Sequence, residues 1–229
     1  MKTIMAIGGH IGDAELTCGG TLATYSLKGY QIITVALTGG EKGNPDHLSV
    51  KDYRIQKEKE AQSFAQMLGG KSIVLPYNDG ELVVSDQIKF EVAELIRQYK
   101  PEFIMTHWKN SMHKDHEATY HIVKDAQFYA GIKGFESAYA PHYARGPYYA
   151  ENWEDPIDFK PYVYMEVSEA GYELWKKAID THWFALNSKS FKYKRYYEAL
   201  MIVRGCEARL MYAEAFDVEE LTKKAIHKL

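Results

Sequence analysis

The chain of 229 residues has few cysteines, no excess of basic residues and no apolar run long enough to cross a bilayer. Its two cysteines, Cys18 and Cys206, are too few for a disulfide framework, which favours a reducing compartment such as the cytoplasm. The 28 basic and 31 acidic residues give a net charge of −3, so no basic surface indicates binding to nucleic acid or anionic lipid.

The amino-terminal stretch MKTIMAIGG is similar to the start of a signal peptide for only a few residues. It has neither a long apolar region nor a cleavage site made of small residues, and we interpret it as a strand. The expected location of the protein is therefore cytoplasmic.

Ordinary globular composition, with 46% hydrophobic and 26% charged residues, predicts one domain over residues 1–229. Up to about residue 130, apolar runs alternate with helical patterns. The expected strands are 3–8, 31–38, 72–77 and 102–108, and the expected helices are 13–28, 51–68, 85–99 and 115–130. This alternation predicts an α/β fold, in which helices cover both faces of a mainly parallel sheet.

Residues 131–165 differ, because they are rich in Gly, Pro and Tyr and have no clear period. We expect long loops with short strands here, inserted near the functional site. A late strand at 162–168 and helices at 171–186 and 194–214 complete the prediction.

Two polar clusters follow the first and fourth predicted strands. One is His10-x-x-Asp13, and the other lies in THWKNSMHKDHEAT (106–119), which holds His107, His113, Asp115 and His116. Because the carboxyl ends of parallel strands meet at one edge, both clusters can reach the same crevice. His10, Asp13 and one histidine of the second cluster would supply the three ligands typical of a catalytic zinc. Taken singly, each residue also suits an ordinary role as a loop histidine or a helix cap.

These stretches resemble the PIG-L/LmbE-like zinc-dependent N-deacetylases. AIGGHIGDAELTCGGTLA (6–23) is similar to their opening motif A-H-P-D-D-x-E-x-x-x-G-G-T-L, and 105–119 is similar to their second motif, which ends in H-x-D-H. LPYNDGEL (75–82) and YAEAF (212–216) resemble the family's third-strand turn and its ending. The resemblance implies a Rossmann-like three-layer sandwich and hydrolysis of an N-acyl group, often from an N-acetylated amino sugar or its conjugate.

The resemblance also implies roles for individual residues. His10, Asp13 and His116 would bind Zn²⁺ or another divalent metal. His113 would stabilise the oxyanion and could protonate the leaving amine, and Asp115, its neighbour in the H-x-D-H motif, would be the second catalytic residue.

The sequence departs from the family at the general base. Gly12 stands where the motif has the aspartate that takes a proton from water, and Ile11 replaces the preceding proline. Losing a general base typically costs about 10²–10⁴ in rate. Glycine is expected to leave empty volume that another carboxylate could enter. The candidates are Glu15, Asp46, Asp79 and Asp115, of which Asp79 and Asp115 lie at predicted strand ends.

Two alternatives follow from the same residues. A family member without the base could bind metal and ligand only, or catalyse a lyase-like or transferase-like reaction. A nucleotide-binding α/β protein is the other alternative, since Gly8, Gly9 and Gly12 faintly resemble a phosphate turn. The G-x-G-x-x-G spacing and the acidic residue that binds a ribose are both absent.

Candidate substrate-binding residues surround the predicted site. Asp79 ends the third strand, His107 could support a metal ligand, and Trp108 could stack on a sugar ring or be a buried strand-end aromatic. Tyr143 and Arg145 lie in the tyrosine-rich segment, which suits a sugar pocket, a subunit interface or simple packing. The expected partner is a small N-acylated sugar conjugate, with a homo-oligomer as a further possibility.

Overall fold

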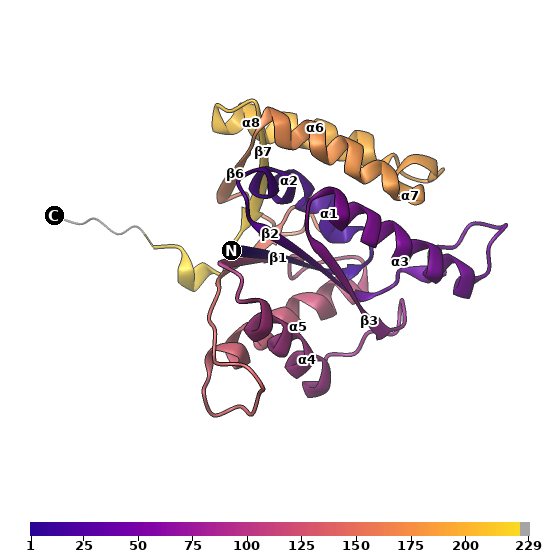
Figure 1. The fold of residues 1–229 in the computed structure, drawn as a ribbon. Coiled ribbons are helices and arrows are strands. Elements are labelled where there is room, and N and C mark those ends of the chain that lie inside the picture. The colour runs from indigo at the N-terminus through magenta and orange to yellow at the C-terminus, as the bar shows by residue number, and fades with distance from the viewer. Residues whose placement is uncertain (225–229) are drawn as a thin grey trace.

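The computed structural model describes residues 1–224 and contains a seven-stranded sheet in the order β3-β2-β1-β4-β5-β7-β6 (Figure 1). The strands are β1 (Thr3–His10), β2 (Gln31–Thr38), β3 (Lys71–Tyr77), β4 (Phe103–Thr106), β5 (Arg145–Ala150), β6 (Val163–Val167) and β7 (Tyr212–Asp217). β1 to β5 pair in parallel, and β7 pairs antiparallel with both β5 and β6. The predicted α/β fold with a mainly parallel sheet is confirmed.

Eight α-helices surround this sheet within residues 1–224. They are α1 (Asp13–Thr17), α2 (Gly19–Leu27), α3 (Val50–Met67), α4 (Asp86–Tyr99), α5 (Lys114–Gly131), α6 (Glu169–Ala178), α7 (Trp183–Asn187) and α8 (Tyr193–Ala208). Short 3₁₀ turns occur at Glu41–Gly43, Ile179–Thr181 and Glu220–Thr222. None of these described helices combines the length and apolar character needed to span a membrane.

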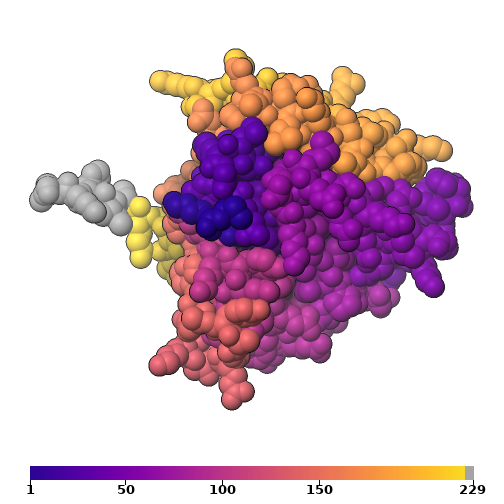
Figure 2. Space-filling model, viewed as in Figure 1, coloured from indigo at the N-terminus to yellow at the C-terminus, as the bar shows by residue number. Residues whose placement is uncertain are grey.

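Successive residues of β1 pack into different cores, as a strand buried on both faces requires. Ile4 and Ala6 contribute to the core that contains residues of α2, α6 and α8. Met5 and Ile7 contribute to the core formed with α4 and α5. Figure 1 shows these two groups of helices on opposite sides of the sheet, and Figure 2 shows α6 and α7 pressed against α3 at the surface.

Three helix predictions need correction. The helix predicted at 13–28 breaks at Cys18, because α2 begins at Gly19 against the Trp175 ring. A Cβ at Gly19 would lie 2.2 Å from Trp175 Cδ1. The helix predicted at 171–186 divides into α6, a 3₁₀ turn and α7. The helix predicted at 194–214 ends at Ala208, since Arg209 adopts a left-handed conformation (φ 60°) and the chain turns into β7.

The YAEAF stretch has a structural role that the sequence did not reveal. It forms most of β7, and from there the buried Glu214 carboxylate accepts hydrogen bonds from the backbone N–H groups of Gly20 and Thr21, both at 2.8 Å. These N–H groups belong to the first turn of α2, where a helix has donors without partners inside it. Glu214 therefore links the last described strand to the helix that follows the opening motif.

Replacing Glu214 with glutamine should lower the free energy of unfolding by about 1–3 kcal/mol. One carboxylate oxygen would become an NH₂ group facing a buried backbone N–H, which leaves that donor unpaired. Denaturant titration of Glu214→Gln measures the change, and Glu166→Gln on the exposed face of β6 is the matched control. Equal stability of the two variants would contradict the proposed role of Glu214.

Candidate metal-dependent active site

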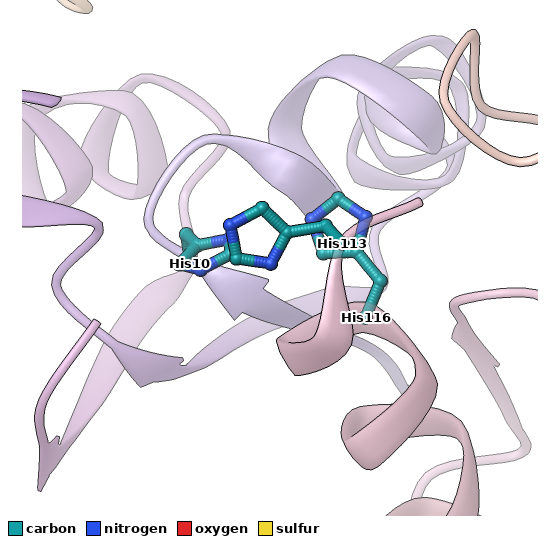
Figure 3. A group of neighbouring side chains, drawn as sticks. All are labelled: His10, His113 and His116. Atoms are coloured by element: carbon teal, nitrogen blue, oxygen red, sulfur yellow. The ribbon is translucent and has the colours of Figure 1, made fainter. Parts of the chain in front are cut away.

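Two segments far apart in the sequence meet at the carboxyl edge of the sheet. β1 ends at His10, and its parallel partner β4 ends at Thr106, shortly before α5 begins at Lys114. The ring centroids of His10 and His113 are 4.5 Å apart, and those of His10 and His116 are 5.2 Å apart. Figure 3 shows the three imidazoles grouped where the amino end of α5 faces the end of β1.

The Asp13 carboxylate lies among the imidazoles. Its Oδ2 atom is 3.2 Å from His10 Nδ1, 3.3 Å from His116 Nε2 and 3.0 Å from His107 Nε2. A tetrahedral zinc with bonds of about 2.0–2.1 Å separates its ligand atoms by about 3.3 Å. The donor types of His10, Asp13 and His116 suit a zinc ion, and the distances of both imidazoles from Asp13 match this spacing. Within residues 1–224, three groups bring their ligand atoms within 4.8 Å of one another: His10 with His113 and His116, Asp13 with His107 and His116, and His10 with Asp79 and Asp115.

The charge on each of His10, Asp13 and His116 depends on the charges of the other two. Burial opposes ionisation of His10 and His116, but Asp13 raises the pKa of His10 well above its usual value and that of His116 to about 9. Burial likewise opposes the charge on Asp13, but His116 and His10 hold its pKa well below the usual range. Such strongly shifted groups in one cluster are typical of functional sites.

Further acidic residues orient the two histidines. His10 Nε2 lies 3.2 Å from Asp79 Oδ1 and 3.3 Å from Asp115 Oδ2, so its Nδ1 atom is left facing Asp13. His116 Nδ1 lies 3.7 Å from Asp155 Oδ1 on the side away from Asp13. Carboxylates behind metal-binding histidines commonly fix ring tautomer and orientation in this way.

Asp115 is fully buried and is not among the residues that line the cavity. It accepts hydrogen bonds from the backbone N–H groups of Gly80 (2.6 Å) and Leu82 (3.3 Å), besides its contact with His10. Asp115 thus holds the turn after β3 against the site. This placement corrects its assignment as a catalytic group and as a substitute base.

Asp79 does line the cavity, but its chemistry disfavours it as a base. Although burial opposes its charge, its hydrogen bond with His10 lowers the pKa of Asp79 to about 2. Its other oxygen accepts a hydrogen bond from the backbone N–H of Lys42 at 2.9 Å. The remaining base candidate on this side, Glu15, is buried and accepts a hydrogen bond from the backbone N–H of Gly12.

His113 is the N-cap of α5, and its Nδ1 atom accepts a hydrogen bond from the backbone N–H of Asp115 at 3.2 Å. The proton of the neutral ring therefore resides on Nε2, since one ring nitrogen donates and the other accepts. Burial, together with positive charge on His10 and His116, lowers the pKa of His113. His113 lines the cavity as a neutral hydrogen-bond donor.

A cavity of about 800 Å³ opens beside these groups. Much of its lining is aromatic and comes from α3, α7, α8 and the loop after β5. The aromatic residues of this lining are Tyr53, Trp153, Trp183, Phe184, Tyr193 and Tyr197.

Gly12 leaves no empty space, contrary to the sequence-based expectation. Its backbone has a φ of 108°, which L side chains rarely adopt, and a Cβ there would lie 2.4 Å from Phe184 Cζ. The Phe184 ring therefore occupies the volume in front of position 12. An additional carboxylate cannot enter that volume while Phe184 holds this position.

Four predicted substrate-binding residues lie outside the cavity lining: His107, which is described below, and Tyr143, Arg145 and Trp108. Tyr143 is exposed, and Arg145 begins β5 opposite Phe103, at the amino edge of the sheet, where its side chain lies 3.5 Å from Glu102. Trp108 is buried and donates a hydrogen bond to the Ile157 carbonyl at 2.9 Å, which leaves it no face for a sugar. These placements correct the assignments of Tyr143, Arg145 and Trp108.

His107 is buried behind the metal-binding cluster. Its ring stacks on His116 with centroids 3.9 Å apart, and its Nδ1 atom lies 3.7 Å from Asp155 Oδ2. His107 does not line the cavity, which corrects its assignment as a substrate-binding residue, and it shares a group of possible metal ligands with Asp13 and His116.

Sequence reasoning missed the residues that close the cavity. Phe184 comes from α7, and Asn152 and Glu154 follow β5. Lys57 also lines the cavity from α3, where it appeared to be one charge among many on a helix. No local pattern in the sequence marked Phe184 or Lys57.

Comparisons with known proteins agree with this architecture. The family model described as PIG-L: GlcNAc-PI de-N-acetylase matches residues 5–127. The 4-oxalmesaconate hydratase of Pseudomonas putida is 25% identical over 191 residues, covering 77% of this chain and 70% of that protein. The diacetylchitobiose deacetylase of Thermococcus kodakarensis is 25% identical over 194 residues, covering 80% of this chain and 69% of that protein.

Two solved structures share the fold. The crystal structure of the 4-carboxy-2-hydroxymuconate hydratase GalB from Pseudomonas putida superposes with a TM-score of 0.88 at 20% identity, over 100% of both chains. The N,N'-diacetylchitobiose deacetylase of Pyrococcus horikoshii superposes with a TM-score of 0.81 at 22% identity, over 95% of this chain and 83% of that chain. At these identities the likeness shows the fold.

Gly12→Asp should lower the free energy of unfolding by about 1–3 kcal/mol and give no gain in N-deacetylation. The new Cβ would require both a strained backbone and displacement of the Phe184 ring. Thermal unfolding and amine release measure the two effects, with Gly134→Asp as the control, because a Cβ at Gly134 meets only open space. A Gly12→Asp protein as stable as the parent would contradict this packing.

Proposed function

The chain belongs to the PIG-L family, and from this membership we propose that it is a metal-dependent hydrolase of N-acyl groups. The substrate class is an amino sugar or a related conjugate, with N-acetyl as the first acyl group to test. The supporting observation is the grouping of His10, Asp13 and His116 beside His113 at the border of a cavity of about 800 Å³.

His10, Asp13 and His116 would hold the ion, since zinc matches their donor atoms and the distances of both imidazoles from Asp13. Bound zinc would supply a Lewis acid for the acyl carbonyl and would lower the pKa of a coordinated water to about 7. Asp79 and Asp115 keep His10 in the tautomer that this role needs.

His113 supplies the hydrogen bond that the reaction requires from the protein. Its Nε2–H group is free to donate, because Nδ1 is engaged by the backbone of Asp115. Placed at the cavity, this donor would stabilise the oxygen on which negative charge develops during attack on an acyl carbon. The same proton would then be available to the leaving amine.

The proton acceptor must differ from that of the family motif, since position 12 has no side chain. Four carboxylates line the cavity: Asp13, Asp46, Asp79 and Glu154. Asp13 is assigned to the metal, and Asp79 is engaged by His10 and the backbone of Lys42. Glu154, whose Oε2 atom lies 3.5 Å from His116 Nδ1, and Asp46 remain as candidates for the acceptor role.

Addition of water to a carbon–carbon double bond is the second candidate function. Gly12 and the Phe184 ring in front of it favour this candidate, because the general base of the deacetylase motif is absent. The similar protein from Pseudomonas putida carries the name 4-oxalmesaconate hydratase. Hydration would use the same metal cluster without a leaving amine.

One experiment separates the two reactions. In one assay, zinc-loaded protein is incubated with N-acetylglucosamine and its glycosides, and release of primary amine is measured. In the other, it is incubated with unsaturated dicarboxylates, and loss of enoate absorbance is measured. We expect amine release that chelation abolishes and added zinc restores.

His113→Ala should reduce that activity by about 10²–10⁴. His121→Ala, an exposed position on the same helix, is the matched control. Enoate loss without amine release would transfer the assignment to hydration. Absence of both activities in zinc-loaded protein would contradict the proposal that the site is an enzyme.

A further inference from the structure

Lys57 is a buried cation without a carboxylate partner. Its side chain comes from α3, the residue is 6% exposed, and its Nζ atom donates a hydrogen bond to the Gly40 carbonyl at 3.1 Å. Among residues 1–224, no carboxylate oxygen lies within the 4.0 Å that defines an ion pair with this nitrogen. An ammonium group has three N–H donors, so two remain for another acceptor.

The Lys57 ammonium lies at the cavity and close to the metal cluster. Lys57, Tyr53 and Phe184 all line the cavity, with Nζ 5.1 Å from the Phe184 ring centroid and 5.6 Å from that of Tyr53. Gly40 separates Lys57 from His10. A Cβ on Gly40 would lie 2.6 Å from Lys57 Nζ and 2.8 Å from His10 Cβ.

Burial of an unpaired charge is costly, and buried lysines in proteins are almost always paired. The carbonyl of Gly40 and the aromatic faces replace only part of the water that this ammonium loses. Bracing the turn at Gly40 would use a single N–H group and would not require a charge. Burial lowers the pKa of Lys57, and Asp13, Asp79, Glu15 and Glu60 oppose that shift through longer-range attraction. An acidic ligand in the cavity would supply the close partner that this side chain lacks among residues 1–224.

The charge pattern around Gly12 agrees with this interpretation. The carboxylate of the family motif is absent at position 12, and the Phe184 ring that fills its place also contacts the Lys57 ammonium. The cavity lining at Lys57 therefore presents an ammonium group beside aromatic rings, whereas Asp13, Asp46, Asp79 and Glu154 line the cavity elsewhere. The lining at Lys57 suits a carboxylate better than the hydroxyl groups of a neutral sugar.

Building on the proposed function, we propose that the substrate is a small acid and that Lys57 binds its carboxylate. The reactive group of the substrate would face His113 and the metal cluster. Its carboxylate would lie against Lys57, between Gly40 and the Phe184 ring. Lys57 thereby determines specificity for anionic over neutral substrates.

Binding to zinc-loaded protein tests this proposal with matched pairs of probes that differ in one carboxylate. N-acetylmuramic acid is paired with N-acetylglucosamine, and N-acetylglycine with N-acetylglycinamide, using calorimetry and ligand-observed NMR. We expect the acid of at least one pair to bind about tenfold more tightly than its neutral partner, as for a hydrogen bond to a charged group.

Lys57→Met should remove that preference and leave binding of the neutral probe and the zinc content unchanged. Lys57→Arg should retain the preference, because it keeps the charge. Lys189→Met is the matched control, since Lys189 is an exposed lysine at the rim of the same cavity.

Three outcomes would overturn the proposal: equal binding of acid and neutral probes, no binding of any acidic probe, or a loss in Lys57→Met that affects both probes equally. The last of these would indicate that Lys57 only supports the fold. Failure of the proposed hydrolase function would appear separately, as absence of turnover by zinc-loaded protein, and would not affect the acid-over-neutral comparison.

Discussion

The site depends on a single carboxylate oxygen that lies within 3.3 Å of three imidazole nitrogens. Asp13 Oδ2 contacts His10 from β1, His107 from the end of β4, and His116 from α5. The glycine pair before His10 permits this approach. A Cβ at Gly8 would lie 2.8 Å from Asp13 Cβ, and one at Gly9 would lie 3.3 Å from His116 Cδ2. Side chains at either position would force the two halves of the cluster apart.

The buried histidines of the cluster are surrounded by further carboxylates. His10 and His116 are each contacted by a carboxylate on the side away from Asp13, so the ring nitrogens aimed at Asp13 are fixed. Asp115 adds the turn after β3 to this network through two backbone hydrogen bonds. The H-x-D-H motif therefore brings together, within four residues, a hydrogen-bond donor at the cavity, a buried carboxylate that contacts His10, and the histidine that we propose as a metal ligand. Its spacing reflects the first turn of α5.

Local sequence patterns correctly predicted β1 to β4 and their parallel arrangement in the sheet. Continuous apolar runs identified β1 and β2, and the parallel arrangement followed from their alternation with helices. The same rule placed His10, Asp13, His113 and His116 at one edge of the sheet. Burial of both sheet faces leaves few other arrangements for such a sequence.

The contacts that depend on tertiary packing could not be predicted from the sequence. Arg145 was placed near the site because its segment seemed to be a loop. In the structure it starts β5, and a strand parallel to β4 begins at the opposite edge. Phe184 reaches Gly12 from a distant helix, and only the backbone conformation at position 12 shows how little room remains. Lys57 differs from other helical lysines only through its burial.

The absorption edge and fine structure of zinc in the loaded protein test the central claim most directly. We predict a first shell of nitrogen and oxygen atoms at about 2.0–2.1 Å from the zinc. We also predict outer-shell scattering from two imidazoles, which is lost in His10→Ala and His116→Ala. A shell of oxygen alone, or one that both substitutions leave unchanged, would contradict the assignment of this cluster as the metal site.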